Sequence, residues 1–153
     1  MDVFEEARQL GTVPLFSKLE ASKLKLIAFT SEQLHLNQGD YLFHFNEPSD
    51  SIFLILEGTL EVVAEHDDGT VDVIVERTKN EIIGEMGVIS NAPRSASIRA
   101  KDSVTVLKIE ADAFLSLLSE NPSMSLYVMR ELSDRLNKSH LRQVKSLKNE
   151  SRH

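Results

Sequence analysis

The chain has 153 residues, with 24 acidic and 17 basic side chains and a formal net charge of −7. This acidic balance argues against a nucleic-acid partner, because phosphate binding needs an excess of Lys and Arg, and the absence of cysteine excludes disulfides, thiol catalysis and thiolate metal sites. Neither a signal segment nor a run of about 20 apolar residues is visible, so we expect a cytoplasmic protein with no membrane span.

Residues 1–30 are predicted to form short helices within a single domain that covers residues 1–153. Asp2 can cap a first helix that continues to Leu10 and ends at Gly11. Pro14 then opens a single turn, and a second helix begins at Ser22, where apolar residues recur at helical spacing. At Ser31 the spacing of apolar residues changes from the helical period to the alternation that is typical of strands.

Short apolar segments separated by turn residues fill positions 31–110. SIFLIL (51–56) and TLEVVAE (59–65) flank Glu57-Gly58, which predicts a two-residue β-hairpin. A second hairpin turns at Asp67 to Gly69. About eight strands at near-regular spacing predict a mainly β fold, an eight-stranded β-roll or jelly roll with flanking helices.

Helical spacing returns after Glu110. One helix is expected over residues 111–120, and Asn121-Pro122 separates it from a long helix that runs toward Leu147. On this long helix one apolar face is formed by Leu126, Met129, Leu132 and Leu136. The helix is long for a protein of this size, so a partner helix or a ligand is expected to cover part of that face.

Charge is unevenly placed along the chain. Residues 137–153 carry five basic groups and one acidic group, while the preceding residues carry a net −11. One interpretation is a solvated helix end, where cations are favoured. The other is a docking surface for an acidic partner.

Residues 78–94 fit neither a strand nor an amphipathic helix, and they hold a possible anion site. Gly84 lets backbone N–H groups approach a ligand, and a short helix starting at Gly84 or Glu85 would direct its positive end at a phosphate. Glu85 can accept a hydrogen bond from a sugar hydroxyl, and Arg94 can fork onto phosphate oxygens. An anion and a hydroxyl on one ligand describe a nucleotide, although a Glu and an Arg nine residues apart are more often a surface ion pair that contributes little.

The segment IIGEMGVISNAPRSASIRA (82–100) resembles the phosphate-binding cassette of the cyclic nucleotide-binding domain family. The matching positions are Gly84, Glu85, Gly87, Arg94, Ser95 and Ala96. SIFLILEGTLEVV also resembles a segment of this family. The resemblance implies N-terminal helices over 1–30, a β-roll over 31–110 with its cassette at 82–97, and C-terminal helices over 111–148.

The resemblance implies a role for each cassette residue. Glu85 would bind the ribose 2′-hydroxyl and Arg94 would neutralise the cyclic phosphate. Backbone N–H groups would line the same pocket near Gly84, Met86, Ser95 and Ala96. Ser95 directly after the arginine is typical of relatives that bind cAMP, with cGMP as the second choice.

The long last helix resembles the family's C-terminal helix, which covers the base and often forms a dimer interface. On that alignment Ser139 and His140 can reach the adenine, although both could instead face solvent. A homodimer through residues 122–148 is therefore possible. The catabolite activator type continues into a helix-turn-helix domain, for which we expect no room here.

These observations predict a regulatory sensor of a cyclic nucleotide that signals through its C-terminal helices to an unidentified effector protein. We expect no enzyme activity, no metal and no cofactor other than the ligand, since the five histidines lack the His-x-His spacing of cupin metal sites. The alternative is a non-sensing dimerisation or docking scaffold. Degenerate cassettes typically lose the Arg or the Glu, and this sequence keeps both Arg94 and Glu85.

Overall fold

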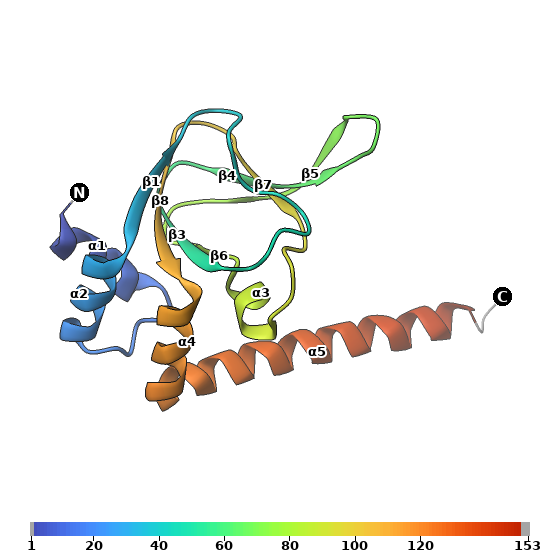
Figure 1. Ribbon diagram of the computed structural model, residues 1–153. Coiled ribbons are helices and arrows are strands. Elements are labelled where there is room, and N and C mark those ends of the chain that lie inside the picture. Colours follow the sequence, from blue (N-terminus) through green and yellow to red (C-terminus); the bar gives the residue numbers. More distant parts are fainter. Residues whose placement is uncertain (1, 151–153) are drawn as a thin grey trace.

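The computed structural model describes the backbone of residues 2–150 and the side chains of residues 2–147. Two four-stranded antiparallel sheets form a roll, with helices at its base (Figure 1). The elements are α1 (Val3–Thr12), α2 (Ala21–Thr30), β1 (Glu32–Leu36), β2 (Tyr41–Phe43), β3 (Ser51–Glu57), β4 (Leu60–Glu65), β5 (Val71–Arg77), β6 (Ile82–Ile83), α3 (Glu85–Ser90), β7 (Ser97–Ala100), β8 (Val104–Glu110), α4 (Ala111–Glu120) and α5 (Pro122–Glu150). The predicted fold class, an eight-stranded roll with flanking helices, is confirmed.

The first helix begins as predicted but ends later. The Asp2 carboxylate accepts a hydrogen bond from the Glu5 N–H at 2.9 Å, which caps α1. Gly11 lies inside the helix, so the predicted end at Leu10 is wrong. A Cβ at Gly11 would lie 3.2 Å from Leu24 Cδ1, so this glycine lets α1 and α2 approach each other closely.

The predicted hairpin between residues 51–56 and 59–65 is also wrong, because β3 and β4 belong to different sheets. One sheet has the order β1-β8-β3-β6 and the other β2-β7-β4-β5. Gly58, with φ +89°, turns the chain from the first sheet into the second. A Cβ there would lie 2.3 Å from the Ser103 carbonyl oxygen, so the crossing passes directly against the turn before β8. The second predicted hairpin, β4 to β5, is confirmed.

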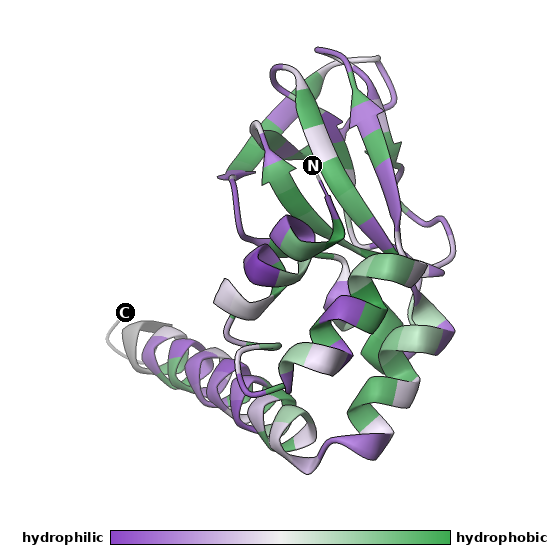
Figure 2. Cartoon of the chain, turned by 90° about the vertical axis from the view of Figure 1, so that its left-hand side faces the viewer, coloured by the Kyte–Doolittle hydropathy of each residue, from purple (hydrophilic) through white to green (hydrophobic). Residues whose placement is uncertain are grey.

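β3 is buried on both of its faces, which explains its unbroken apolar sequence. Ile52, Leu54 and Leu56 pack in a cluster with the helices. Phe53 and Ile55 point the other way, into a second cluster inside the roll. Figure 2 shows the apolar strands and the inward faces of the helices meeting along this layer.

The last two helices leave the roll at β8. Phe114 of α4 is fully buried and meets Phe16 edge-on, with ring centroids 6.3 Å apart. The predicted apolar face of α5 is not its buried face, since Met129 is 58% and Leu136 71% exposed. Val128 packs on the core instead, together with Met124 and, in part, Leu132. α5 therefore runs past the roll (Figure 1), and three of the four residues of its predicted apolar face, Leu126, Met129 and Leu136, are exposed. None of the helices within residues 2–150 is both long and apolar enough to cross a membrane.

Candidate functional site

The segment between β6 and β7 folds as a loop that carries the six-residue helix α3. Gly84, with φ +86°, precedes the helix and Asn91, with φ +52°, ends it. The predicted helix start at Gly84 or Glu85 is therefore confirmed. A Cβ at Gly87 would lie 2.4 Å from Ser49 Oγ, so the loop before β3 packs tightly on α3.

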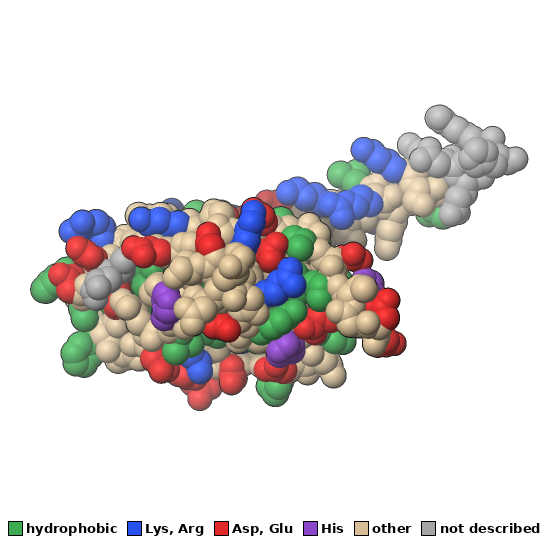
Figure 3. Space-filling model, turned by 90° about the horizontal axis from the view of Figure 1, so that it is seen from above, with side chains coloured by type: hydrophobic (Ala, Val, Ile, Leu, Met, Phe, Trp, Pro, Cys, Tyr) green, Lys and Arg blue, Asp and Glu red, His purple; other side chains and the backbone are tan. Residues whose placement is uncertain are grey.

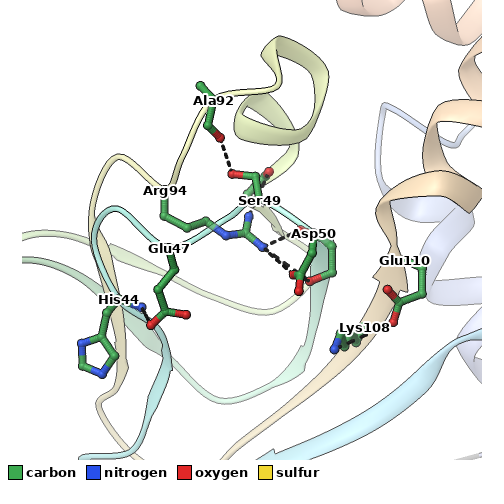
Figure 4. Close-up of polar contacts among 10 residues, drawn as sticks. His44, Glu47, Ser49, Asp50, Ala92, Arg94, Lys108 and Glu110 are labelled. Carbon is green, nitrogen blue, oxygen red and sulfur yellow. Dashed lines mark hydrogen bonds and ion pairs between the residues drawn. The ribbon is translucent and has the colours of Figure 1, made fainter.

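The loop of residues 44–50 holds the end of this segment in place. The Arg94 N–H donates to the Glu47 carbonyl at 2.8 Å, and the Asn46 N–H donates to the Arg94 carbonyl at 2.9 Å. The Ser49 hydroxyl donates to the Ala92 carbonyl at 2.7 Å (Figure 4). These bonds fix the backbone on both sides of Pro93, and the side chain of Arg94 extends inward from this point.

Arg94 is buried, at 3% exposure, and connects β3 to the start of α3. Its Nη2 donates to the Ser51 carbonyl at 2.8 Å and its Nη1 donates to the Gly84 carbonyl at 3.3 Å. The guanidinium carbon lies 4.1 Å from the ring centroid of Phe43, a cation–π contact. Figure 4 shows the side chain pointing toward Asp50 from the opposite loop.

The positive charge of Arg94 is only partly balanced. Asp50 Oδ1 lies 3.7 Å from Nη2, but the Asp50 side chain is 73% exposed. Arg94 Nε has no hydrogen-bond partner among the described residues. Burial lowers the pKa of Arg94 from its ordinary value, while Asp50 and Glu47 oppose that shift. A buried cation of this kind is stabilised by a nearby anion.

A cavity of about 380 Å³ opens beside Arg94. This size falls within the range of roughly 300–1,000 Å³ that is typical of small-molecule sites. The cavity is lined by Phe43, Ser49, Val62, Arg77, Ile82, Ile83, Gly84, Glu85, Met86, Gly87, Ser90, Ala92, Pro93, Arg94, Ser95, Ala96, Ile98 and Arg135. Residues from both sheets, from α3 and from α5 thus meet around one space.

Glu85 lies on this cavity with a side chain that is 24% exposed. Burial raises the pKa of Glu85 above its ordinary value, while a backbone hydrogen bond and the charges of Arg135 and Arg77 act in the opposite direction. Arg135 Nη2 lies 3.7 Å from Glu85 Oε1. The carboxylate is thus held at the edge of the cavity, next to the last helix.

The structure brings all six predicted cassette residues to one cavity: Gly84, Glu85, Met86, Arg94, Ser95 and Ala96. Glu85 pairs with Arg135 and Arg94 with Asp50, so the two do not form the surface ion pair of the alternative interpretation. Ser139 and His140 do not join them, since both are exposed on α5 and neither lines the cavity.

Among the lining residues outside the cassette, three with aromatic or charged side chains were not predicted from the sequence. The ring of Phe43 packs against the guanidinium of Arg94. Arg77 and Arg135 add positive charge to the cavity wall. A signal for Arg135 exists in the sequence, because Tyr127, Glu131 and Arg135 recur every four residues and so share a face of α5. Within the described side chains, no group of three His, Cys, Asp or Glu residues could hold a metal ion.

A β-roll whose helix-bearing loop places an arginine and a glutamate on one cavity has the arrangement of a small-molecule-binding domain. The family model "Cyclic nucleotide-binding domain" matches residues 33–121 and so identifies the class of domain. The chain belongs to this family.

Two known proteins are more than 30% identical in sequence to this chain. An uncharacterized NTE family protein of Mycobacterium bovis is 32% identical over 130 residues, which cover 85% of this chain and 22% of that protein. A cyclic nucleotide-binding-like protein from Brucella abortus is 31% identical, with a TM-score of 0.66 over 75% of this chain and 98% of that one. The chain therefore spans about a fifth of the mycobacterial relative's length.

The fold is also similar to the sensor domain of the transcriptional regulator DNR from Pseudomonas aeruginosa. The TM-score is 0.83 at 20% identity, over 89% of this chain and 91% of that domain. This likeness concerns the whole arrangement of roll and helices, including the regions outside the segment matched by the family model.

Proposed function

We propose that this protein is a sensor that binds a cyclic nucleotide, with cAMP the favoured ligand, in the cavity of its roll and signals through α4 and α5 to a partner. The observation that carries the proposal is the partly balanced cation of Arg94 on a cavity that also exposes the carboxylate of Glu85. A cyclic phosphate carries the negative charge that would balance the guanidinium of Arg94. A ribose hydroxyl can donate a hydrogen bond to the carboxylate of Glu85.

The base would lie toward the mouth of the cavity, where α5 contributes Arg135. Ser95 after the arginine supports cAMP over cGMP, through the family resemblance of the cassette. Ser139 and His140 lie further along α5 and would meet the base only after α5 moves over the mouth. Such a movement couples ligand binding to the helix, because a ligand shifts a conformational equilibrium by its different affinity for the two states.

Calorimetric titration of the purified protein with cAMP and with cGMP tests the proposal. We expect binding of both, with cAMP tighter, and a loss of about ten- to hundredfold in affinity for Arg94→Gln, since one charge-assisted hydrogen bond contributes about 1.5–3 kcal/mol. Arg99→Gln is the matched control, because Arg99 pairs with Glu61 and does not line the cavity.

Hydrogen exchange of residues 111–147 during the same titration tests the relay. We expect slower exchange in α4 and α5 when the nucleotide is bound. If neither nucleotide binds below millimolar concentration, the protein is a scaffold with the same fold. If a nucleotide binds but exchange in the helices stays the same, the relay part of the proposal is wrong.

A further inference from the structure

A polar cluster lies on the outer face of the sheet β2-β7-β4-β5, on the side away from the cavity. Ser97 of β7 pairs with Val63 of β4 in this sheet. Their chain neighbours Ile98 and Val62 line the cavity, and successive side chains of a strand point to opposite faces. Ser97 and Val63 therefore point outward, and yet both are fully buried. The loop of residues 44–50 contacts Ser97 on this outer face.

Glu65, at the end of β4, is the acceptor at the centre of this cluster. Its Oε2 accepts a hydrogen bond from the Ser97 hydroxyl at 3.0 Å, and its Oε1 lies 3.2 Å from His44 Nδ1. The Ser97 oxygen in turn accepts a hydrogen bond from the Phe45 N–H at 2.8 Å. Glu65 thus contacts the start of the loop directly through His44 and indirectly through Ser97.

The carboxylate of Glu65 determines how its two donors are oriented. A carboxylate only accepts hydrogen bonds, so the Ser97 hydroxyl hydrogen points to Glu65, which leaves an oxygen lone pair for the Phe45 N–H. For the same reason the hydrogen of a neutral His44 ring lies on Nδ1. The pKa of Glu65 is lowered, because hydrogen bonds from Ser97, His44 and Tyr41 stabilise the charged form, although burial acts in the opposite direction.

The loop that begins at this cluster is also the loop that holds Arg94. The His44 N–H donates to Glu47 Oε1 at 3.0 Å, and the Glu47 carbonyl accepts from the Arg94 N–H at 2.8 Å. At the other end of the loop, Asp50 lies 3.7 Å from Arg94 Nη2. Figure 4 shows the imidazole of His44 pointing away from Arg94. The His44 ring is therefore outside the candidate site, while its backbone is connected to the site through Glu47.

We propose that Glu65 is a positioning residue for the nucleotide site, because together with Ser97 and His44 it fixes the loop of residues 44–50 against the sheet. The imidazole of His44 makes this role depend on pH. Histidine side chains change their charge between about pH 5 and pH 8, and a protonated His44 forms an ion pair with Glu65 in place of a neutral hydrogen bond. Protonation of His44 therefore favours nucleotide binding. Since this role concerns the same cavity, it rests on the proposed function.

The titratable groups around His44 come from four parts of the roll. Glu65 comes from β4, and Tyr41 of β2 stacks its ring on the imidazole with centroids 4.4 Å apart. Glu47 of the loop itself accepts from the His44 backbone. Arg99 of β7 pairs with Tyr41 in the sheet and has a carboxylate partner of its own on β4. Figure 3 shows histidine side chains next to acidic ones on the roll, seen from above. Protonation of His44 thus adds a positive charge beside the carboxylate of Glu65.

Calorimetry of the full chain with cAMP at about pH 6 and about pH 8 tests the role of His44. His44→Gln keeps a neutral amide donor toward Glu65 and cannot be protonated. The parent protein should bind cAMP about two- to fivefold more tightly than this variant at the lower pH, the range of a solvent-screened ion pair, and the ratio should be smaller at the higher pH. Glu85 titrates alike in both proteins, so the ratio reports His44 alone.

His66→Gln is the matched control. His66 pairs with Asp72 on the β4–β5 hairpin at 2.6 Å, and its side chain is 48% exposed, against 49% for His44. Among the described residues, no hydrogen bond joins His66 to the loop of residues 44–50. Its ratio to the parent protein should therefore be the same at both pH values. A ratio for His44→Gln that does not change with pH, or one for His66→Gln that changes as much, would overturn the role of His44.

Amide hydrogen exchange of the ligand-free protein, followed by NMR, tests the role of Glu65 without a nucleotide. In Glu65→Gln one amide oxygen replaces two carboxylate oxygens, so it cannot accept from both donors in the same way. We expect the Phe45 and Arg94 amides to exchange at least about threefold faster than in the parent protein. Asp72→Asn, the matched change on the hairpin, should leave both rates unchanged.

The two measurements distinguish failure of the positioning role from failure of the proposed function. If Glu65→Gln exchanges faster and no nucleotide binds to the parent protein, Glu65 still positions the loop and the proposed function is wrong. If Glu65→Gln exchanges like the parent protein at both amides, Glu65 does not position the loop, whether or not cAMP binds.

Discussion

Arg135 Nη2 lies 3.7 Å from Glu85 Oε1, so an ion pair joins the cassette helix α3 to the last helix α5. Glu85 is also the residue proposed to accept a hydrogen bond from the ribose. A bound nucleotide and Arg135 would therefore compete for one carboxylate. This competition connects occupation of the cavity with the position of α5, without any further element between them.

Arg135→Gln is expected to tighten nucleotide binding, because it removes the competitor of the ribose. Because the Arg135 side chain is 56% exposed, solvent screens this ion pair and its contribution is about 1 kcal/mol or less, so the gain in affinity should be about two- to fivefold. Calorimetry with cAMP measures it. Arg130→Gln, at an exposed arginine on the same helix, should leave the affinity unchanged. A weaker affinity for Arg135→Gln would mean that Arg135 contacts the nucleotide instead.

Glu85→Gln is expected to stabilise the ligand-free protein near pH 7. Burial raises the pKa of Glu85, so the folded state favours the protonated carboxyl over the carboxylate. The stability that this group contributes is complete below the unfolded pKa and is lost as the pH rises through the folded pKa. Gln resembles the neutral form and keeps that stability at high pH.

Urea unfolding of the Glu85→Gln variant at pH 7 and at about pH 4 checks this sign. The advantage of the variant in free energy of unfolding should be present at pH 7 and should shrink at the lower pH. Glu120→Gln, at an exposed glutamate at the end of α4, should show no comparable difference. An advantage that grows toward acid would contradict the assignment of the raised pKa to Glu85.

The sequence predicted those parts of the fold that depend on neighbours along the chain. The unbroken apolar run of β3, the turn at Asp67 to Gly69 and the helix start at Gly84 each have a local cause. The crossing at Gly58 does not, because a glycine turn with positive φ serves a hairpin or a change of sheet equally well. The change of sheet depends on the packing of Gly58 against Ser103, which lies 45 positions away in the sequence.

The candidate site likewise has one part that is visible in the sequence and another that depends on the folded chain. Gly84, Glu85 and Arg94 lie within eleven residues, and their chemistry is visible as a pattern. Phe43 and Arg135 reach the cavity from β2 and α5, so the folded chain has to bring them there. Of the apolar face predicted for α5, Leu132 packs on the core in part, whereas Leu126, Met129 and Leu136 have the right spacing for a buried face and yet remain exposed.

Arg94→Gln is expected to destabilise the fold even without a nucleotide. The guanidinium donates to the carbonyl oxygens of Ser51 and Gly84, and a buried acceptor left without a donor costs about 1–3 kcal/mol. Urea unfolding followed by circular dichroism measures the loss. Arg130→Gln, at an exposed arginine of α5, should change the stability by no more than about 0.5 kcal/mol.

Gly84→Ala separates the backbone role of the cassette glycine from its role in placing Arg94. Gly84 has φ +86°, and a Cβ there would lie 2.4 Å from Arg94 Nη1. Gly69 has φ +88° with nothing within 4 Å of its Cβ position, so Gly69→Ala carries the backbone strain alone. That strain costs about 1–2 kcal/mol for a residue other than glycine.

Both alanine variants should therefore lose stability in urea unfolding, with Gly84→Ala losing more. Only Gly84→Ala should also weaken cAMP binding, because the added methyl group displaces the guanidinium from the cavity wall. If the two variants lose the same stability and both retain the parent affinity, the close approach of Gly84 to Arg94 does not matter for the site. If Gly69→Ala weakens binding as well, the effect comes from the roll as a whole rather than from the position of Arg94.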